Sequence, residues 1–262
     1  MTRTILVVLN TVTFAAVILI NIVTAYGDLH GNTVGEVSRK FNSLFAPAGY
    51  AFSIWGLIYL MLAGFVAFQW YALISRKYSE LIDNTSWYFI LSNIANVLWL
   101  VCWLNELIGL SVIIMLILLW SLIMLVLKHD MELKDAAFPV LVFTWWPISV
   151  YTGWIVTATV ANIAAYLNIY WNGYPLTPQL WTIIMIIIAF VIYILLILKR
   201  NMREAAFVGI WALSAIAVRH WEQENEIAYT ALTAAIILFI YSVYEAYKNR
   251  KTLPFVRKLF GN

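Results

Sequence analysis

Apolar residues along the chain gather into eight long runs, which short polar segments separate. The runs cover approximately residues 4–25, 50–74, 87–104, 107–127, 138–167, 179–198, 205–219 and 227–247. A helix needs roughly 20 mostly apolar residues to cross a bilayer, and its backbone groups must pair within the segment. Stretches such as Ile183–Ala189 do not alternate as the strands of a membrane barrel would. The pattern therefore predicts an all-α, polytopic transmembrane helix bundle with about eight spans.

The positions of Lys and Arg support the interpretation that the seventh run, Ala205–Arg219, spans the membrane although it is the shortest. If all eight runs span the membrane, thirteen basic residues fall on one side and three on the other. The larger group comprises Arg3, Arg76, Lys77, Lys128, Lys134, Lys199, Arg200, Arg203, Lys248, Arg250, Lys251, Arg257 and Lys258, and the smaller group Arg39, Lys40 and Arg219. Because cytoplasmic loops collect Lys and Arg, we expect both termini in the cytoplasm, with the bundle in a bacterial plasma membrane.

Two segments near the start of the chain allow more than one interpretation. The first run follows Arg3 as a signal peptide would, but it stays apolar to Val23, beyond the usual core of about 7–15 residues. An uncleaved first helix is therefore favoured. The segment Tyr26–Gly49 is polar at first and then apolar at Leu44 and Phe45. It either folds over the outer mouth of the bundle or forms a solvated connector.

The composition indicates that lipid solvates most of the chain. Hydrophobic residues make up 64% and charged residues 11%, about half the charged fraction of a soluble domain. The single cysteine, Cys102, excludes an internal disulfide. The histidines lie in three different loops, so no metal site is expected. We also expect no cofactor and no nucleic-acid partner, and the lipid bilayer is the expected surrounding.

The apolar runs lack the functional groups that several classes of membrane protein require. No run carries Asp, Glu, Lys or Arg near its middle, where ion-coupled carriers and proton pumps usually keep such a group. The last two runs contain no lysine that could form a Schiff base, and no glycine-rich phosphate loop precedes a helix. Serine, histidine and carboxylate groups are not clustered as nucleophilic catalysis requires. The sequence therefore indicates no catalytic residues and favours a protein that is not an enzyme.

Aromatic and amide side chains recur at helical spacing in three of the runs. The chain has 13 Trp, 15 Tyr and 14 Phe. Rings near the run ends fit the interfacial belt, whereas deep tryptophans face helices or a ligand because lipid offers no acceptor for an indole N–H. The shared helix faces are Trp55, Tyr59 and Leu62; Ser92, Asn96, Trp99 and Trp103; and Pro147, Tyr151, Trp154, Ala158 and Asn162.

Two asparagines on these faces bring amide groups into hydrocarbon. An unpaired amide there costs roughly 2–7 kcal/mol. One interpretation is that Asn96 and Asn162 join helices by hydrogen bonds, as polar residues often do in membrane bundles. The other is an aromatic-walled cavity with a few polar contacts, suited to a flat apolar ligand. The spacing leaves both open, and the cavity requires Trp55, Trp99 and Trp154 to face inward.

The second run and the residues before it carry a more specific motif. Pro47 is followed eight residues later by Trp55, then four residues later by Tyr59, and eleven residues after that by Trp70. This spacing resembles the signature of the tryptophan-rich sensory protein / translocator protein family (TspO/MBR), of the peripheral benzodiazepine receptor type.

Two further helices strengthen the resemblance. The Asn-x-x-Trp of the family's third helix is matched by Asn96 and Trp99, and its fifth-helix pair by Trp154 and Asn162. Three separate helices therefore agree with the family in motif and in order.

The sequence also departs from the family pattern at three places. Ala46 stands where the family usually has a proline, and Gly49 stands where it has a loop tryptophan. Pro147 lies seven residues before Trp154 instead of four. The resemblance covers roughly residues 1–168.

The resemblance implies a five-helix unit over residues 1–168 that binds tetrapyrroles such as porphyrins, or sterol-like molecules, often as a homodimer. Its pocket would open towards the long loop after the first helix. Residues 169–262 would form a three-helix extension with a basic cytoplasmic tail. The expected ligand-binding residues are Trp55, Tyr59, Asn96, Trp99, Tyr151, Trp154, Ala158 and Asn162.

We therefore expect a membrane protein that senses or translocates such a ligand. The alternatives are a transporter of a hydrophobic metabolite and a slow tetrapyrrole-degrading enzyme.

Overall fold

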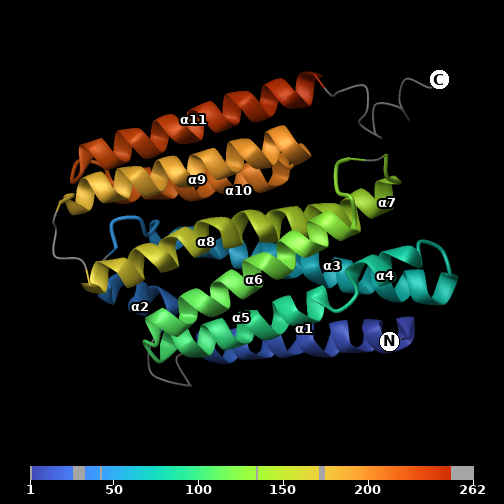
Figure 1. The fold of residues 1–262 in the computed structure, drawn as a ribbon. Coiled ribbons are helices and arrows are strands. Elements are labelled where there is room, and N and C mark those ends of the chain that lie inside the picture. The colour runs from blue at the N-terminus through green and yellow to red at the C-terminus, as the bar shows by residue number, and fades with distance from the viewer. Residues whose placement is uncertain (1, 26–32, 42, 134, 171–174, 249–262) are drawn as a thin grey trace.

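The computed structural model describes residues 2–25, 33–41, 43–133, 135–170 and 175–248, and these segments contain helices but no β-strand. These segments form eight long helices, which run side by side (Figure 1). They are α1 (Arg3–Ala25), α3 (Ile54–Ser75), α5 (Tyr88–Leu104), α6 (Ile108–Lys128), α8 (Trp146–Tyr170), α9 (Pro178–Arg200), α10 (Arg203–His220) and α11 (Asn225–Lys248). Shorter elements are α2 (Val34–Lys40), the 3₁₀ turn η1 (Gly49–Ser53), α4 (Glu80–Thr85), α7 (Phe138–Val140) and the π-helical turn η2 (Leu141–Trp145).

Seven of the long helices coincide with predicted runs to within a few residues, and the run 138–167 corresponds to α7, η2 and α8 together, so the polytopic helical bundle is confirmed. Six of the spans are long and apolar enough to cross a membrane. The other two long helices are α5, with 17 residues, and α10, with 18 residues. α10 corresponds to the run that was shortest in sequence, and charged residues lie at both of its ends.

α8 lies between two groups of helices (Figure 1). On one side α3 and α6 pack against it, with α1 and α5 beyond them, and on the other side α9 and α10 pack against it, with α11 beyond them. Of an apolar 18-residue stretch in the span that contains α8, 83% is buried within the protein, against 28–44% for such stretches in the other five long apolar spans. Because its two faces enter two different hydrophobic cores, α8 is the element that joins the two groups.

The contact between α8 and α10 depends on a glycine. A Cβ atom at Gly153 would lie 2.7 Å from the carbonyl oxygen of Ala205 and 2.8 Å from its Cα. These distances are shorter than real Cβ contacts, so only glycine lets the two backbones approach this closely. Tyr193 of α9 closes the same region, because its hydroxyl donates to the Gly153 carbonyl at 2.7 Å.

The segment after α1 folds against the bundle. α2 begins after Thr33, whose side chain and backbone exchange hydrogen bonds with Glu36, and the bond from the Thr33 N–H lowers the pKa of the Glu36 carboxyl. Val37 and Phe45 are each 1% exposed. Of the two interpretations of this loop, the described residues support the one in which it covers the bundle, whereas residues 26–32 and 42 lie outside the described part.

The start of α1 and the end of α11 lie at the same end of the bundle. Figure 1 shows the start of α1 and the end of α11 together at the end that carries α4, and α2 at the opposite end. We call these the α4 end and the α2 end. Among the described residues, eight Lys and Arg lie at the α4 end and three at the α2 end. The first group is Arg3, Arg76, Lys77, Lys128, Lys199, Arg200, Arg203 and Lys248, and the second is Arg39, Lys40 and Arg219.

Candidate functional site

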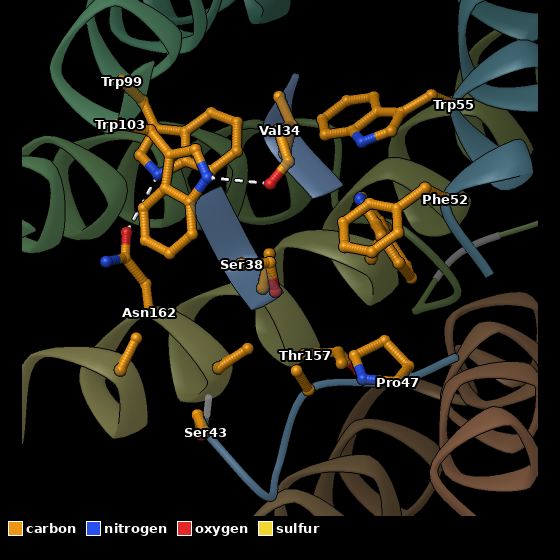
Figure 2. Close-up of a pocket in the computed structure, with 15 residues that line it drawn as sticks. Val34, Ser38, Ser43, Pro47, Phe52, Trp55, Trp99, Trp103, Thr157 and Asn162 are labelled. Atoms are coloured by element: carbon orange, nitrogen blue, oxygen red, sulfur yellow. Dashed lines mark hydrogen bonds between the residues drawn. The ribbon is translucent and has the colours of Figure 1, made fainter. Parts of the chain in front are cut away.

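A cavity lies between α2, α3, α5 and α8 (Figure 2). Its volume is about 50 Å³, whereas one water molecule needs roughly 10–15 Å³ on this measure. In Figure 2, Trp99 and Trp103 lie on one side of the space, and Trp55 and Phe52 lie on the other. The lining residues, none of them charged, are Val34, Ser38, Ser43, Ala46, Pro47, Phe52, Trp55, Trp99, Trp103, Trp154, Thr157, Ala158, Ala161, Asn162 and Ala165.

One wall of the cavity is a flat aromatic surface on α5. Trp99 and Trp103 lie one turn apart, their ring centroids are 5.9 Å apart, and their planes differ by 23°. Each indole N–H has an acceptor. Trp99 donates to the side-chain oxygen of Asn162 at 2.9 Å, and Trp103 donates to the carbonyl of Val34 at 3.2 Å. The second bond fastens α2 over this wall.

The two asparagines have different positions. Asn162 lines the cavity and also joins helices, because its amide nitrogen donates to the Ser111 hydroxyl of α6 at 2.9 Å. Asn96 lies behind the cavity wall, where its amide nitrogen donates to the Tyr151 hydroxyl at 3.0 Å. Its side-chain oxygen accepts a longer bond of 3.4 Å from Asn21 of α1. Helix joining therefore describes Asn96, whereas Asn162 combines both roles considered from the sequence.

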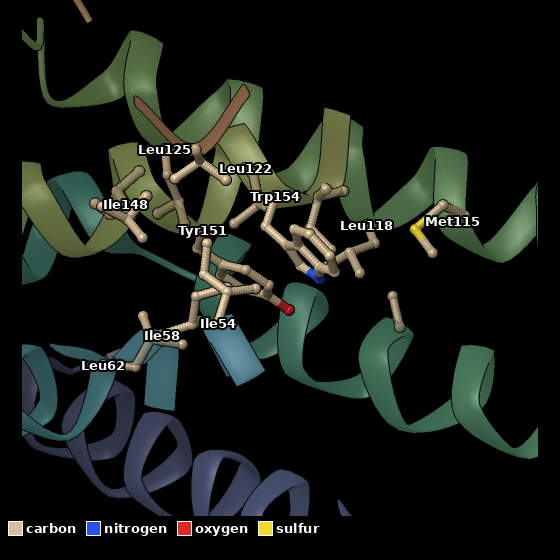
Figure 3. Close-up of a cluster of buried hydrophobic side chains, with 14 of the residues drawn as sticks. Ile54, Ile58, Leu62, Met115, Leu118, Leu122, Leu125, Ile148, Tyr151 and Trp154 are labelled. Carbon is tan, nitrogen blue, oxygen red and sulfur yellow. The ribbon is translucent and has the colours of Figure 1, made fainter. Parts of the chain in front are cut away.

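The opposite wall is built around Trp154, which projects from α8 into a cluster of rings. Its ring meets Phe52 and Trp55 edge to face, at centroid distances of 5.9 and 6.2 Å. Figure 3 shows Trp154 next to Tyr151, between apolar side chains of α3 and α6. The indole nitrogen of Trp154 is buried and has no hydrogen-bond partner among the described residues. An unpaired buried N–H costs about 1–3 kcal/mol.

Residues 7–244 match the sequence model of a family described as TSPO-like protein. The chain belongs to the TSPO-like protein family. The resemblance found from Pro47, Trp55 and Tyr59 is therefore confirmed. The match includes α9, α10 and α11, whereas the motifs recognised in the sequence covered only residues up to about 168. No curated protein and no solved structure matches the chain.

Five of the eight residues expected to bind a ligand line the cavity of this TSPO-like chain. They are Trp55, Trp99, Trp154, Ala158 and Asn162. The other three support it from behind: Tyr59 stacks on Trp55 with ring centroids 5.3 Å apart, and Asn96 and Tyr151 are bonded to each other. The requirement that Trp55, Trp99 and Trp154 face inward is therefore met.

Several lining residues were not among those expected from the sequence. Ala161 and Ala165 share a face of α8 with Trp154 and Ala158, so helical spacing could have identified them. Val34 and Ser38 on α2 carry no such signal, because a seven-residue helix in a loop gives no extended apolar pattern. Other missed residues, some of them already noted within the motifs, are Ser43, Ala46, Pro47, Phe52, Trp103 and Thr157.

Proposed function

We propose that this TSPO-like membrane protein binds a flat, largely apolar ligand, such as a tetrapyrrole or a sterol-like molecule, in the cavity under α2. The proposal rests on one observation: Trp55, Trp99 and Trp154 from three helices converge on one uncharged space inside the bundle. Aromatic faces provide large contact areas to a planar apolar ligand. We propose that the protein uses this binding to sense or translocate the ligand.

The chemistry of the walls supports a ligand with few polar atoms. Trp99 and Trp103 already use their N–H groups within the protein, so their exposed faces offer stacking alone. The Trp154 N–H has no partner among the described residues, and a ring nitrogen, hydroxyl or carbonyl of the ligand would be a suitable acceptor for it. Any carboxylate on the ligand would be expelled from the uncharged interior towards the mouth, where α2 carries Arg39 and Lys40.

The size of the cavity requires that α2 moves when such a ligand binds. Pockets that hold a ligand of this size usually measure about 300–1,000 Å³, whereas this cavity measures about 50 Å³. Among the described residues, few bonds hold α2 and the residue after it in place. Trp103 bonds to Val34, Lys40 pairs with Glu106 at 2.5 Å, and Asn168 donates to the Phe41 carbonyl at 2.8 Å. We infer that the ligand binds by displacing α2.

The direct test is a titration of the purified protein in detergent with protoporphyrin IX and, separately, with a sterol. We expect saturable binding of at least one probe, read from the porphyrin absorption band or from sterol retention. Trp154→Ala should weaken this binding about tenfold or more, because it removes one ring wall and the unpaired donor. The matched control is Trp221→Ala, since Trp221 is 49% exposed outside the cavity. Absence of saturable binding to both probes, or equal losses in the two variants, would refute the proposal.

We also propose that the α4 end faces the cytoplasm, so that the cavity at the α2 end opens to the other side. The excess of basic residues at the α4 end supports this orientation. In a Cys102→Ala background, an impermeant maleimide added to intact cells should label Gln223→Cys and spare Leu133→Cys. The reverse pattern would contradict this orientation. Assembly as a homodimer and the bacterial plasma membrane as its location stay predictions from the sequence.

A further inference from the structure

One wall of the cavity is an irregular stretch of chain, residues 43–52, which we call the wall segment. Its residues Ser43, Ala46, Pro47 and Phe52 line the cavity. Up to Ala48 the wall segment is not helical. The Ser43 and Ala48 carbonyls accept bonds from Ala46 and Ala51 inside the segment, whereas the Leu44 and Ala46 carbonyls are bonded from outside it. At membrane depth, irregular backbone is stable only where other parts of the protein satisfy it. The groups that bond to these carbonyls therefore hold the wall segment in place.

The partners lie at the end of α10. Nη1 of Arg219 donates to the carbonyl oxygens of Ser43 and Ala46, at 2.9 and 2.7 Å. Nε2 of His220 lies 2.7 Å from the carbonyl oxygen of Leu44. Because a carbonyl can only accept, this nitrogen carries the hydrogen. Two adjacent side chains of α10 thus satisfy three carbonyls of the wall segment.

Two further turns of α10 continue the same contact. The amide of Ala48 donates to the carbonyl of Ala215 at 3.1 Å, and the indole nitrogen of Trp211 donates to the carbonyl of Ala51 at 3.1 Å. The ring of Tyr50 packs edge-on against Trp211, with centroids 5.3 Å apart. Residues 211, 215 and 219 are spaced by four, so one face of α10 follows the wall segment along its length.

α10 is itself firmly placed. Its backbone lies against α8 at Gly153, where a single added carbon would collide with Ala205. Phe45 of the wall segment inserts into the hydrophobic core that α8 shares with α9, α10 and α11. The wall segment is therefore attached to the C-terminal helices on one side and lines the cavity on the other.

We propose that α10 is the positioning helix of the ligand cavity, with Arg219 as its main positioning residue. By holding the carbonyls of the wall segment, Arg219 keeps Pro47 and Phe52 at the cavity surface. This inference rests on the proposed function and gives the C-terminal helices a role in it. Residues 169–262 are then part of the ligand-binding unit and not a separable extension.

The test compares Arg219→Gln with Arg3→Gln in the full-length protein. Both substitutions remove a cation that bonds between distant segments, but Arg3 pairs with Asp83 at the α4 end, away from the cavity. We expect the Kd for protoporphyrin IX to rise about tenfold in Arg219→Gln, as the loss of two charge-assisted hydrogen bonds suggests. Arg3→Gln should stay within about twofold of the wild type, since its pair is exposed. Equal Kd values in Arg219→Gln and the wild type would overturn the inference.

A second measurement needs no ligand. Hydrogen exchange of backbone amides should become faster across residues 43–52 in Arg219→Gln, while the amides of α5 keep their wild-type rates. A merely global loss of stability would speed exchange in both. If the wild type binds no probe but the exchange result holds, the proposed function fails and the positioning role of Arg219 stands. If the probe binds normally and exchange in the wall segment is unchanged, the positioning role alone fails.

His220 provides an independent pair of variants in case Arg219→Gln does not fold. His220→Gln keeps a donor near the position of Nε2, whereas His220→Leu has none. We expect His220→Gln to retain the wild-type Kd within about twofold and His220→Leu to raise it about threefold or more, as the loss of a single hydrogen bond suggests. Equal Kd values in these two variants would contradict a role for the bond to Leu44.

Discussion

The two faces of α8 are built from different kinds of residue. Towards α3 and α5 it presents Tyr151, Trp154 and Asn162, and a cavity lies on this side. We call this the open face. Towards α9 and α10 it presents Gly153, and on this closed face the helix backbones approach one another. Thr157 lies at the border of the two faces, because it lines the cavity and also bonds to the Tyr193 hydroxyl of α9 at 2.6 Å.

The difference shows how side-chain shape decides where a membrane bundle is open. Small residues let helix backbones approach, and the resulting contact leaves no space. Large flat rings such as Trp55 and Trp154 meet edge to face on the open face, and both line the cavity there. In this protein the closed face fixes α10, and α10 in turn bonds to the wall segment of the open face. The closed side thus provides the rigid support for the open side.

The largest expected effect comes from opening the closed face. Gly153→Leu should lower the free energy of unfolding by about 3 kcal/mol or more, because the added carbons collide with the backbone of Ala205. In detergent this corresponds to a fall of roughly 6–12 °C in the thermal midpoint. The control is Gly56→Leu, where an added carbon meets nothing within 4 Å. If both variants melt like the wild type, the close contact between α8 and α10 is wrong.

A smaller effect should follow from breaking the polar network of the open face. Asn162→Leu leaves the Trp99 N–H without its acceptor, which costs about 1–3 kcal/mol. Adding Trp99→Phe removes the unpaired donor, so the double variant should regain part of the lost stability. Thermal unfolding of the two single variants and the double variant measures this coupling. Strictly additive losses would show that the bond between Trp99 and Asn162 does not exist.

The two helix groups also meet at the α4 end, where Asn201 donates to Glu132 at 3.3 Å. Burial, followed by the charge of Glu204, raises the pKa of Glu132 to about 7. The folded protein therefore binds a proton more tightly than the unfolded chain, so stability is full below about pH 4.5 and falls as the pH rises through 7.

Glu132→Gln should accordingly melt higher than the wild type at pH 8.5 by roughly 2–4 °C, which corresponds to about 1 kcal/mol. The two proteins should melt alike near pH 4.5, where Glu132 is protonated in both states. The exposed Glu80→Gln on α4 is the control and should show no such pH dependence. A lower midpoint for Glu132→Gln at pH 8.5 would contradict the burial of this carboxyl.

The smallest effect concerns the cover of the open face. Lys40→Met removes the ion pair with Glu106, and exposed pairs contribute about 0–1 kcal/mol. The Kd for protoporphyrin IX should change less than about threefold, while its association, followed by stopped flow, should become faster because α2 is displaced more easily. Lys248→Met, which removes a pair with Glu245 at the α4 end, is the control. Equal association rates in Lys40→Met and the wild type would contradict a role for this ion pair in holding α2 over the cavity.

Much of the candidate site could be predicted because its residues repeat at helical spacing. Trp99 and Asn162 were selected from such repeats, and both line the cavity. Tyr59 and Asn96 follow the same spacing but lie behind the wall, because spacing gives the face of a helix and not its distance from a neighbouring helix. Val34 belongs to a short helix whose position depends on bonds to other segments, so no local pattern could have identified it.

The sequence by itself determined the eight helices and their approximate bounds, because lipid requires each span to be long, apolar and internally hydrogen-bonded. It also determined the family, through the spacing of Pro47, Trp55 and Tyr59. Only the tertiary structure decided that Arg219, separated from Ser43 by 176 residues, holds the wall of the cavity. A bond between such distant residues depends on how the helices pack, and helix packing is decided by side-chain contacts that no local pattern records.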